Sequence, residues 1–196
     1  KLVQQINACR QCTLGDKRTK AVPGDGSLEA DVLLTGEAPG YYEDQAGKPF
    51  VGRAGQLLDK LLESINLSRE AVYITNLLKC RPPNNRDPLP HEIKSCSDYL
   101  KQQIEIISPK LIITLGRYSL SRFFPNNPIS QVRGTLMEYK NIYLFPVYHP
   151  AAGLRNGNIM NKLQGDFAKI PEIIGSLKNT ENETRIKQKD SQLNLF

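Results

Sequence analysis

The sequence predicts an α/β domain of three layers, α/β/α, built around a central four-stranded parallel sheet. Short apolar runs that are typical of buried strands alternate with longer amphipathic runs that are typical of helices. This alternation is the usual order of elements in a parallel sheet. With 196 residues, the chain is long enough for one such domain with a substantial core. We expect this domain to occupy residues 1–177.

Four apolar segments are predicted to form the strands of the sheet. They are 31–35, 72–76, 111–116 and the stretch from 142 to about 148, which is the second arm of a hairpin with first arm 135–139. Apolar residues at helical spacing predict helices between and around them. These are 1–12, 54–65, 90–107, 117–124 and 159–177.

Charge and hydrophobicity limit the classes of protein that the chain can represent. The net charge of +6 fits a polyanionic partner, but many proteins are equally basic, so charge alone is weak evidence for nucleic acid. No apolar run approaches the ~20 residues that cross a bilayer. The polar, amphipathic start at 1–5 does not have the pattern of a signal peptide. We therefore expect a cytoplasmic protein with no membrane partner, and a monomer.

The loop Gly36–Gly40 follows the first apolar run and marks the candidate site. Its two glycines and one proline end the strand. Ligands of open α/β sheets bind at the carboxyl ends of the strands. Taken alone, the loop fits a plain turn with a solvated Glu37 equally well. Asn76 and His149, however, also follow apolar strands, so the three polar side chains are expected at one edge of the sheet.

The four cysteines indicate a metal centre. They are Cys9 and Cys12 in a Cys-x-x-Cys pair, and the separated Cys80 and Cys96. Structural disulfides are rare in intracellular proteins, and four thiolates can hold a metal. The spacing leaves an iron–sulfur cluster and a structural zinc equally open, with a redox pair plus two unrelated thiols as a third alternative.

The composition changes from about residue 178 onward. Asn, Glu, Thr, Lys and Gln dominate residues 178–196, which predicts a disordered tether. This tail ends in the apolar stretch Gln192–Phe196. That stretch is either a mere chain end or a docking peptide.

Several short motifs, taken in their order along the chain, resemble those of a known family. From Cys9 to about Phe167 the chain resembles the family-four uracil-DNA glycosylases, the iron–sulfur branch of their superfamily. The motifs are Cys9-x-x-Cys12, 36–40, 47–52, Thr75-Asn76 with 80–83, Cys96 and 149–152. One departure is Ala38, where the family often has Gly, and this narrows the floor of the pocket.

The resemblance implies that uracil is flipped out of DNA into a pocket and its bond to deoxyribose is hydrolysed, which starts base excision repair. The expected uracil-binding residues are Gly36, Glu37, Ala38, Phe50, Asn76 and His149. The amide of Asn76 would distinguish uracil from cytosine, and the ring of Phe50 would stack on the base, although Phe50 could instead plug the core.

The expected catalytic residues are Glu37, Glu43 and His149. His149 would donate to uracil O2. Either carboxylate would offset the positive charge of the sugar or orient the water, and the sequence does not choose between them. No lysine nucleophile is called for, so we expect a monofunctional enzyme without lyase activity.

The resemblance also implies a 4Fe-4S cluster on Cys9, Cys12, Cys80 and Cys96, with a structural function near DNA. The predicted DNA contacts are Arg53, Arg81 and Arg86 to phosphates, with Leu154 and Arg155 in the gap left by the flipped base. The tail end 192–196 resembles a peptide that docks on a sliding clamp. The rival hypotheses are a non-catalytic nucleic-acid-binding module stapled by iron–sulfur or zinc, and a redox protein using Cys9 and Cys12.

Overall fold

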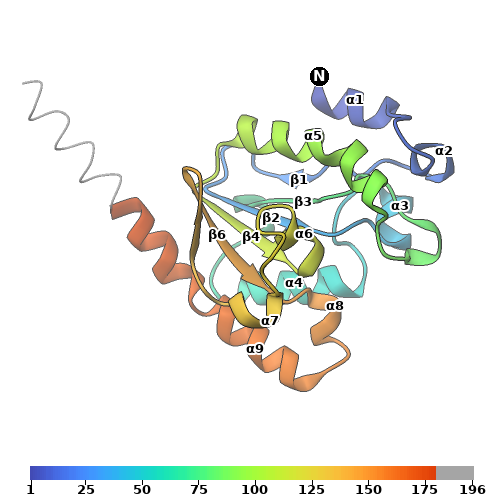
Figure 1. The fold of residues 1–196 in the computed structure, drawn as a ribbon. Coiled ribbons are helices and arrows are strands. Elements are labelled where there is room, and N and C mark those ends of the chain that lie inside the picture. Colours follow the sequence, from blue (N-terminus) through green and yellow to red (C-terminus); the bar gives the residue numbers. More distant parts are fainter. Residues whose placement is uncertain (180–196) are drawn as a thin grey trace, which may run out of the picture.

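The computed structural model describes residues 1–179, which form a six-stranded mixed sheet with helices on both faces (Figure 1). The strands follow the order β1-β3-β2-β4-β6-β5 across the sheet. Their bounds are β1 Asp25–Gly26, β2 Val32–Gly36, β3 Tyr73–Asn76, β4 Leu111–Leu115, β5 Met137–Tyr139 and β6 Ile142–Val147.

The sheet is wider than the four-stranded parallel sheet expected from the sequence, and it is mixed. β3, β2, β4 and β6 pair in parallel, while β1 and β5 pair antiparallel at the two edges. The edge strand β1 has only two residues and no apolar run, so no pattern in the sequence marks it as a strand. In contrast, all residues of β2, β3 and β4 are buried, as expected for strands covered on both faces.

Helices connect and cover the strands. Their bounds are α1 Leu2–Ala8, α2 Leu14–Lys17, α3 Tyr41–Ala46, α4 Arg53–Glu63, α5 Pro90–Ile107, α6 Arg117–Ser121, α7 Ile129–Val132, α8 Pro150–Gly153 and α9 Gly157–Phe167, with 3-10 turns at Arg69–Ala71 and Pro83–Asn85. The chain is helical again over 170–179 after a break at 168–169, where one continuous helix was expected.

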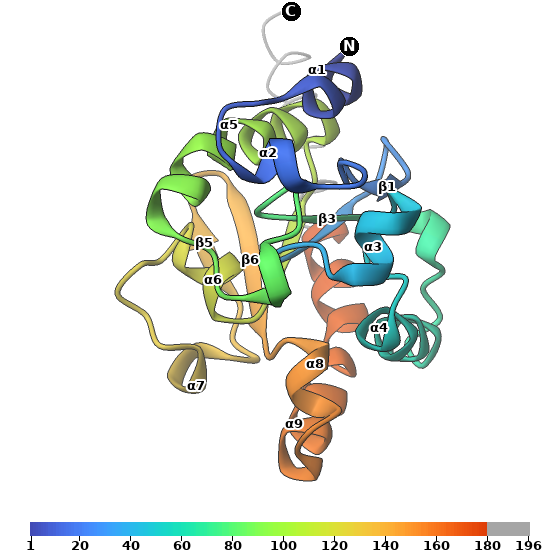
Figure 2. The same cartoon turned by 90° about the vertical axis from the view of Figure 1, so that its right-hand side faces the viewer.

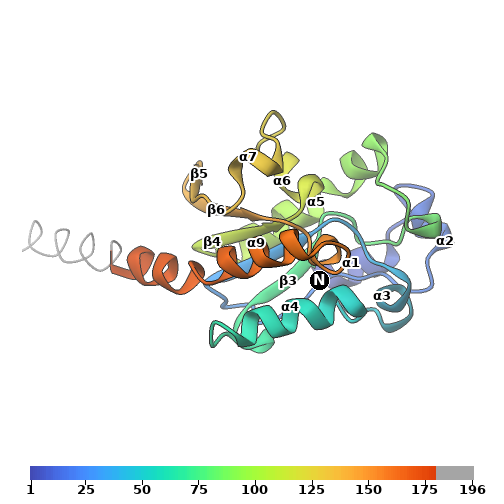
Figure 3. The same ribbon diagram turned by 90° about the horizontal axis from the view of Figure 1, so that it is seen from below.

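The two faces of the sheet carry separate cores because neighbouring strand residues point to opposite sides. In β2, Leu34 packs against α4 and α9 on one face, while Leu33 packs towards α5 on the other. Figures 1 and 3 show α4 and α9 on one side of the sheet and α5 on the opposite side. The arrangement leaves the carboxyl edge of the strands open for a site.

A third cluster joins the N-terminal helices to α5. Ile6 of α1 and Leu14 of α2 pack with Leu78 and Tyr99, and Figure 2 shows α1 and α2 beside α5. All four cysteines belong to this cluster or pack against it. Within residues 1–179, no helix has both the length and the apolar character that crossing a membrane requires.

Candidate active site

A cavity of about 640 Å³ lies at the carboxyl edge of the parallel strands. Gly36 ends β2 and is in register with Asn76, which ends β3. His149 follows β6, and its backbone approaches Gly116 at the end of β4. The sequence-predicted residues that line this cavity are Glu37, Ala38, Glu43, Phe50, Asn76, Arg86, His149 and Arg155. The fold therefore brings the amide, the imidazole and the carboxylates to one place.

Gly36 lets two side chains approach each other at the cavity wall. A Cβ atom at this position would lie 2.4 Å from Oδ1 of Asn76 and 2.6 Å from Cζ of Phe50. Real Cβ atoms do not come so close to heavy atoms. The glycine is thus required by the close approach, rather than by a left-handed backbone.

The side chain of Asn76 offers an unused acceptor. Asn76 is 2% exposed, and its Oδ1 is buried with no hydrogen-bond partner among the described residues. Leaving such an oxygen unpaired costs about 1–3 kcal/mol. An amide in a cavity wall with a free oxygen is suited to a ligand that presents an N–H group.

His149 is held as a neutral donor. Its Nδ1 accepts a hydrogen bond of 3.1 Å from the backbone N–H of Ala151, so the proton of the neutral ring is on Nε2. Burial, helped by the positive charge of Arg155, lowers the pKa of His149 to about 4, although Glu43 opposes this. At neutral pH, His149 can therefore donate through Nε2–H without carrying a charge.

The Phe50 loop is fixed from two directions. Phe50 has a left-handed backbone, with φ of +53°, and Arg69 donates to its carbonyl oxygen at 3.1 Å and to that of Pro49. Asp59 holds Arg69 in turn, at 2.9 Å. A Cβ at Gly55 would lie 1.8 Å from the Phe50 oxygen, so α4 can start here only with glycine.

The carboxylate of Glu43 accepts hydrogen bonds from the backbone of both loops that line the site. Its Oε1 accepts from the N–H groups of Val51 at 3.0 Å and Gly52 at 2.9 Å, and its Oε2 accepts from Gly40 at 3.1 Å. The carboxylate thereby ties the Gly36–Gly40 loop to the Phe50 loop. These contacts favour a structural function for Glu43 over a catalytic one.

Glu37 has the properties of a reactive carboxylate. Burial raises its pKa to about 7, the negative charge of Asp87 adds to this effect, and Arg117 opposes it. Its carboxylate is therefore half-ionised near neutral pH. A group of this kind in a cavity can orient a water molecule or offset a developing positive charge.

The four cysteines lie around one small cavity of their own. Cys9, Cys12, Cys80 and Cys96 line it together with Arg18, Lys79 and Tyr99. All four thiols are free, and within residues 1–179 no three His, Cys, Asp or Glu side chains are placed closely enough to hold a metal ion together. Arg18 donates to Sγ of Cys80 at 3.0 Å, and the N–H of Lys79 donates to Sγ of Cys96 at 3.3 Å. These donors favour the thiolates, but burial is the larger effect: it raises the pKa of Cys80 and takes the pKa of Cys96 to about 11. The four side chains are therefore suited to a metal centre only if the metal displaces the thiol protons.

The basic residues predicted to meet DNA differ in their surroundings. Arg86 is paired with the buried carboxylate of Glu92 at 2.6 Å. The Arg81 guanidinium bonds Asn85 at 2.7 Å and lies 5.1 Å from the ring centroid of Tyr41. Both residues are thus partly committed to contacts within the protein.

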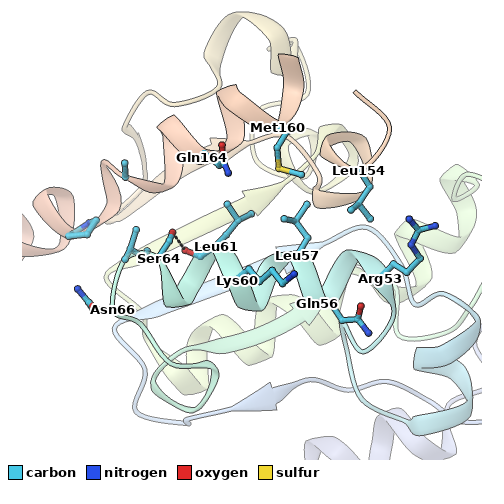
Figure 4. A pocket seen from close by; sticks show the side chains of 13 residues that line it. Arg53, Gln56, Leu57, Lys60, Leu61, Ser64, Asn66, Leu154, Met160 and Gln164 are labelled. Atoms are coloured by element: carbon cyan, nitrogen blue, oxygen red, sulfur yellow. Dashed lines mark hydrogen bonds between the residues drawn. The ribbon is translucent and has the colours of Figure 1, made fainter. Parts of the chain in front are cut away.

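Arg53 and Leu154 line a second groove, of about 980 Å³, next to the first cavity. Figure 4 shows this groove between α4 and α9, with Arg53 and Leu154 at one end and Leu57 facing Met160. Leu154 is 40% exposed. An exposed apolar side chain beside the candidate site is available to enter a DNA duplex.

Sequence reasoning missed the ion pair of Arg117 with Asp87, whose nitrogen and oxygen are 2.6 Å apart at the cavity rim. Arg117 directly follows Gly116 at the end of β4. The rule that pointed to Asn76 and His149, a polar side chain at the carboxyl end of a strand, could have found it. Arg69 gave no such signal, because its contacts with the Phe50 loop are distant in sequence.

This fold and site define an α/β protein with a polar pocket suited to a flat heterocyclic ring. Residues 23–169 match the family model described as the uracil DNA glycosylase superfamily. The chain belongs to this superfamily.

Relatives of known name cover most of the chain. The chain is 48% identical over 183 residues to a type-4 uracil-DNA glycosylase of Sulfurisphaera tokodaii. The match covers 88% of this chain and 83% of the relative. The type-4 enzyme of Archaeoglobus fulgidus is 45% identical over 188 residues, with 91% and 94% covered. That of Saccharolobus solfataricus is 49% identical over 186 residues, with 89% and 86% covered. The family resemblance predicted from the motifs is confirmed.

Proposed function

We propose that the protein is a monofunctional uracil-DNA glycosylase that takes a flipped uracil into the cavity and hydrolyses its bond to deoxyribose. The observation that carries this proposal is the unpaired Oδ1 of Asn76, buried in a cavity that also holds Phe50 and the neutral His149. The superfamily match and the names of the relatives support the same reaction.

Asn76 would select uracil through its amide. Oδ1 accepts from uracil N3–H and the NH₂ group donates to O4. Cytosine presents an acceptor at N3 and a donor at N4, so both contacts would become unfavourable. Phe50 would give the base a ring on which to stack, and Ala38 with the backbone near Glu37 would form the floor, while Gly36 makes room for Asn76 and Phe50.

His149 would stabilise the departing base. Bond cleavage places negative charge on uracil O2 and positive charge on the sugar, and the Nε2–H group of His149 can donate to that oxygen. In other enzymes, removing one donor of this kind raises the activation free energy by ~3–4 kcal/mol. A neutral imidazole serves this purpose because it needs no proton transfer before the reaction.

Of the two candidate carboxylates, we assign the chemistry to Glu37. Its carboxylate would orient the attacking water and offset the charge of the sugar, while Glu43 would hold the loops. No lysine is among the described residues that line the cavity, which supports hydrolysis without lyase activity.

DNA would contact the rim of this cavity. Arg155 lines the cavity, and Leu154 lies next to it with Arg53 in the neighbouring groove. Leu154 would fill the space of the flipped base, and the arginines, with Arg81 and Arg86, would contact phosphates. Unstacking is least costly at a U·G mismatch or in a single strand.

Cys9, Cys12, Cys80 and Cys96 would hold a 4Fe-4S cluster, which the resemblance to the family implies and the shared cavity supports. The four thiolates would ligate the irons of this cluster and so tie distant segments of the chain together. The segment 80–96 would thereby be pinned against α1 and α2 beside the DNA.

The clamp peptide predicted at Gln192–Phe196 lies outside the described residues and stays a proposal. A pull-down with purified bacterial and archaeal clamps should retain the full chain and lose a chain ending at Asn179. Equal retention of both would contradict it.

The test of the function is release of free uracil from single-stranded and U·G DNA. We expect release by the purified protein, and loss of release in Asn76→Ala and His149→Ala. The matched control is Asn161→Ala, an exposed asparagine of α9, which should keep the activity. DNA binding without any uracil release would instead favour the non-catalytic binding module.

A further inference from the structure

Lys79 is a buried lysine that the proposed reaction does not use. Its side chain is 1% exposed, and its ammonium donates three short hydrogen bonds. The acceptors are Oγ1 of Thr75 at 2.7 Å, the backbone oxygen of Asn76 at 2.6 Å and Oε1 of Gln103 at 2.6 Å. All three acceptors are neutral groups. They orient the ammonium but do not balance its charge.

The other end of Lys79 reaches the cysteine cluster. Its backbone N–H donates to Sγ of Cys96 at 3.3 Å, and Cys80 is the next residue in the chain. Lys79 also lines the small cavity that the four cysteines share. Lys79 therefore contacts both the backbone of Asn76, through its side chain, and the cysteine cluster, through its own backbone.

We propose that Lys79 is a positioning residue that fixes Asn76 for reading the base and joins the backbone of Asn76 to the segment that carries Cys80 and Cys96. The inference deepens the proposed function and rests on it. The ammonium holds the carbonyl of Asn76 on one side, and the N–H of Leu77 bonds Gly36 at 3.0 Å on the other. The side-chain amide of Asn76 therefore projects from a residue whose following peptide group is held at both its carbonyl and its N–H. The same lysine connects that backbone to the cysteine cluster.

Lys79→Met tests this connection, because methionine keeps an unbranched chain and removes the ammonium. We expect kcat/KM for uracil release to fall about tenfold or more, as is common when two groups act as a unit. In the double variant with Asn76→Ala, the further loss should disappear. In the double variant with His149→Ala, which does not touch Lys79, the full loss should remain. If Lys79→Met lowers kcat/KM by the same factor in the Asn76→Ala and His149→Ala backgrounds as in the wild type, Lys79 merely stabilises the fold. This result would overturn the proposal.

A control and a second variant keep the test decisive. Lys101→Met removes an exposed lysine of α5 and should change nothing. If Lys79→Met does not fold, Gln103→Met removes one of the three acceptors of the ammonium, together with the hydrogen bonds that Gln103 donates to Pro23 and Tyr73. It should show the same pattern, coupled to Asn76→Ala and independent of His149→Ala, and independence from both would again overturn the proposal.

Binding of free uracil separates this inference from the proposed function. Lys79→Met should weaken uracil binding about tenfold or more, measured by calorimetry on the full chain. A wild-type protein that binds free uracil but does not excise uracil from DNA would contradict the glycosylase function and leave this inference standing. Unchanged uracil binding in Lys79→Met would overturn the positioning of Asn76, whereas Lys101→Met should bind uracil as the wild type does.

Discussion

The ring of Phe50 lies nearly parallel to the imidazole of His149, with centroids 5.7 Å apart and an interplanar angle of 27°. Phe50 comes from the loop before α4, and His149 comes from the end of β6. Both rings line the same cavity, of about 640 Å³. Phe50 is buried to 5% exposure without closing that cavity. Phe50 belongs to the core cluster on this face of the sheet and also lines the cavity, so the ring packs in the core and still leaves open space beside it.

Gly36→Ala should displace both walls of the uracil pocket. The added Cβ would meet Oδ1 of Asn76 at 2.4 Å and Cζ of Phe50 at 2.6 Å, so the amide and the ring must both shift. A displacement of about 1 Å in a positioning group can lower a rate about 100-fold. We expect a loss of that size in kcat/KM for uracil release.

The matched control for this prediction is Gly165→Ala in α9. A Cβ there meets nothing within 4 Å, and alanine is favoured over glycine in a helix by about 0.5–1 kcal/mol. This variant should keep its activity and unfold at a slightly higher temperature. Full activity in Gly36→Ala would mean that the base does not lie against Asn76 and Phe50.

The sequence was sufficient to predict the inner strands and the residues at their carboxyl ends, because both follow from apolar runs in parallel strands. The inner strands are marked by apolar runs, and parallel strands place their carboxyl ends at one edge. Gly36, Asn76 and His149 could be placed together for that reason alone. The edge strand β1 could not be predicted, because two residues carry no periodic pattern.

Glu43→Gln should loosen the loops that carry Phe50. The carboxylate accepts hydrogen bonds from Gly40, Val51 and Gly52, and an amide would point its NH₂ group at one of these N–H groups. Leaving buried donors unpaired costs about 1–3 kcal/mol each. We expect a clearly lower melting temperature, measured by circular dichroism. Glu63→Gln, an exposed residue at the end of α4, is the control and should melt as the wild type does. An unchanged melting temperature in Glu43→Gln would return Glu43 to the catalytic candidates.

The contacts of Glu43, Arg69 and Lys79 lie beyond sequence reasoning for a different reason. Each is a long polar side chain whose partners belong to other segments, such as Arg69 with Pro49 or Lys79 with Gln103. Solvated and buried glutamates or lysines look alike in a sequence, because burial depends on tertiary packing. Glu43 could therefore be identified as a site residue, but not as the acceptor that joins two loops.

The dependence of activity on pH should report Glu37. With a pKa of about 7, its carboxylate is mostly protonated at pH 6 and mostly ionised at pH 8, so kcat/KM should rise about tenfold across this interval. His149, with a pKa of about 4, stays neutral throughout and adds no step. Glu37→Gln should be slower and independent of pH over the same interval. A rising limb that persists in Glu37→Gln would assign the titration to another group.

The raised pKa of Glu37 also predicts how the free energy of unfolding changes with pH. The pKa of Glu37 is raised from 4.5 to about 7, so the folded state binds more protons than the unfolded state between these values. The contribution is fully present below pH 4.5 and is lost as the pH rises through 7, by no more than about 3 kcal/mol. Glu37→Gln lacks this loss. Its stability relative to the wild type, from urea unfolding, should increase from pH 5 to pH 8, and a decrease would contradict the shift.

Loss of a ligand of the proposed cluster should loosen the segment beside the site before it unfolds the sheet. Cys80 and Cys96 pack with Ile6, Leu14 and Tyr99, whereas the sheet has its own cores on both faces. Cys96→Ser, or removal of iron by a chelator, should abolish the visible absorption and increase amide hydrogen exchange in 77–96 while β2 and β4 stay protected. Ser97→Ala on the same helix is the control and should keep the absorption, since its hydroxyl only bonds the Lys94 carbonyl. Iron-free protein that retains native exchange in 77–96 and cuts DNA normally would show that the cysteines do not pin this segment.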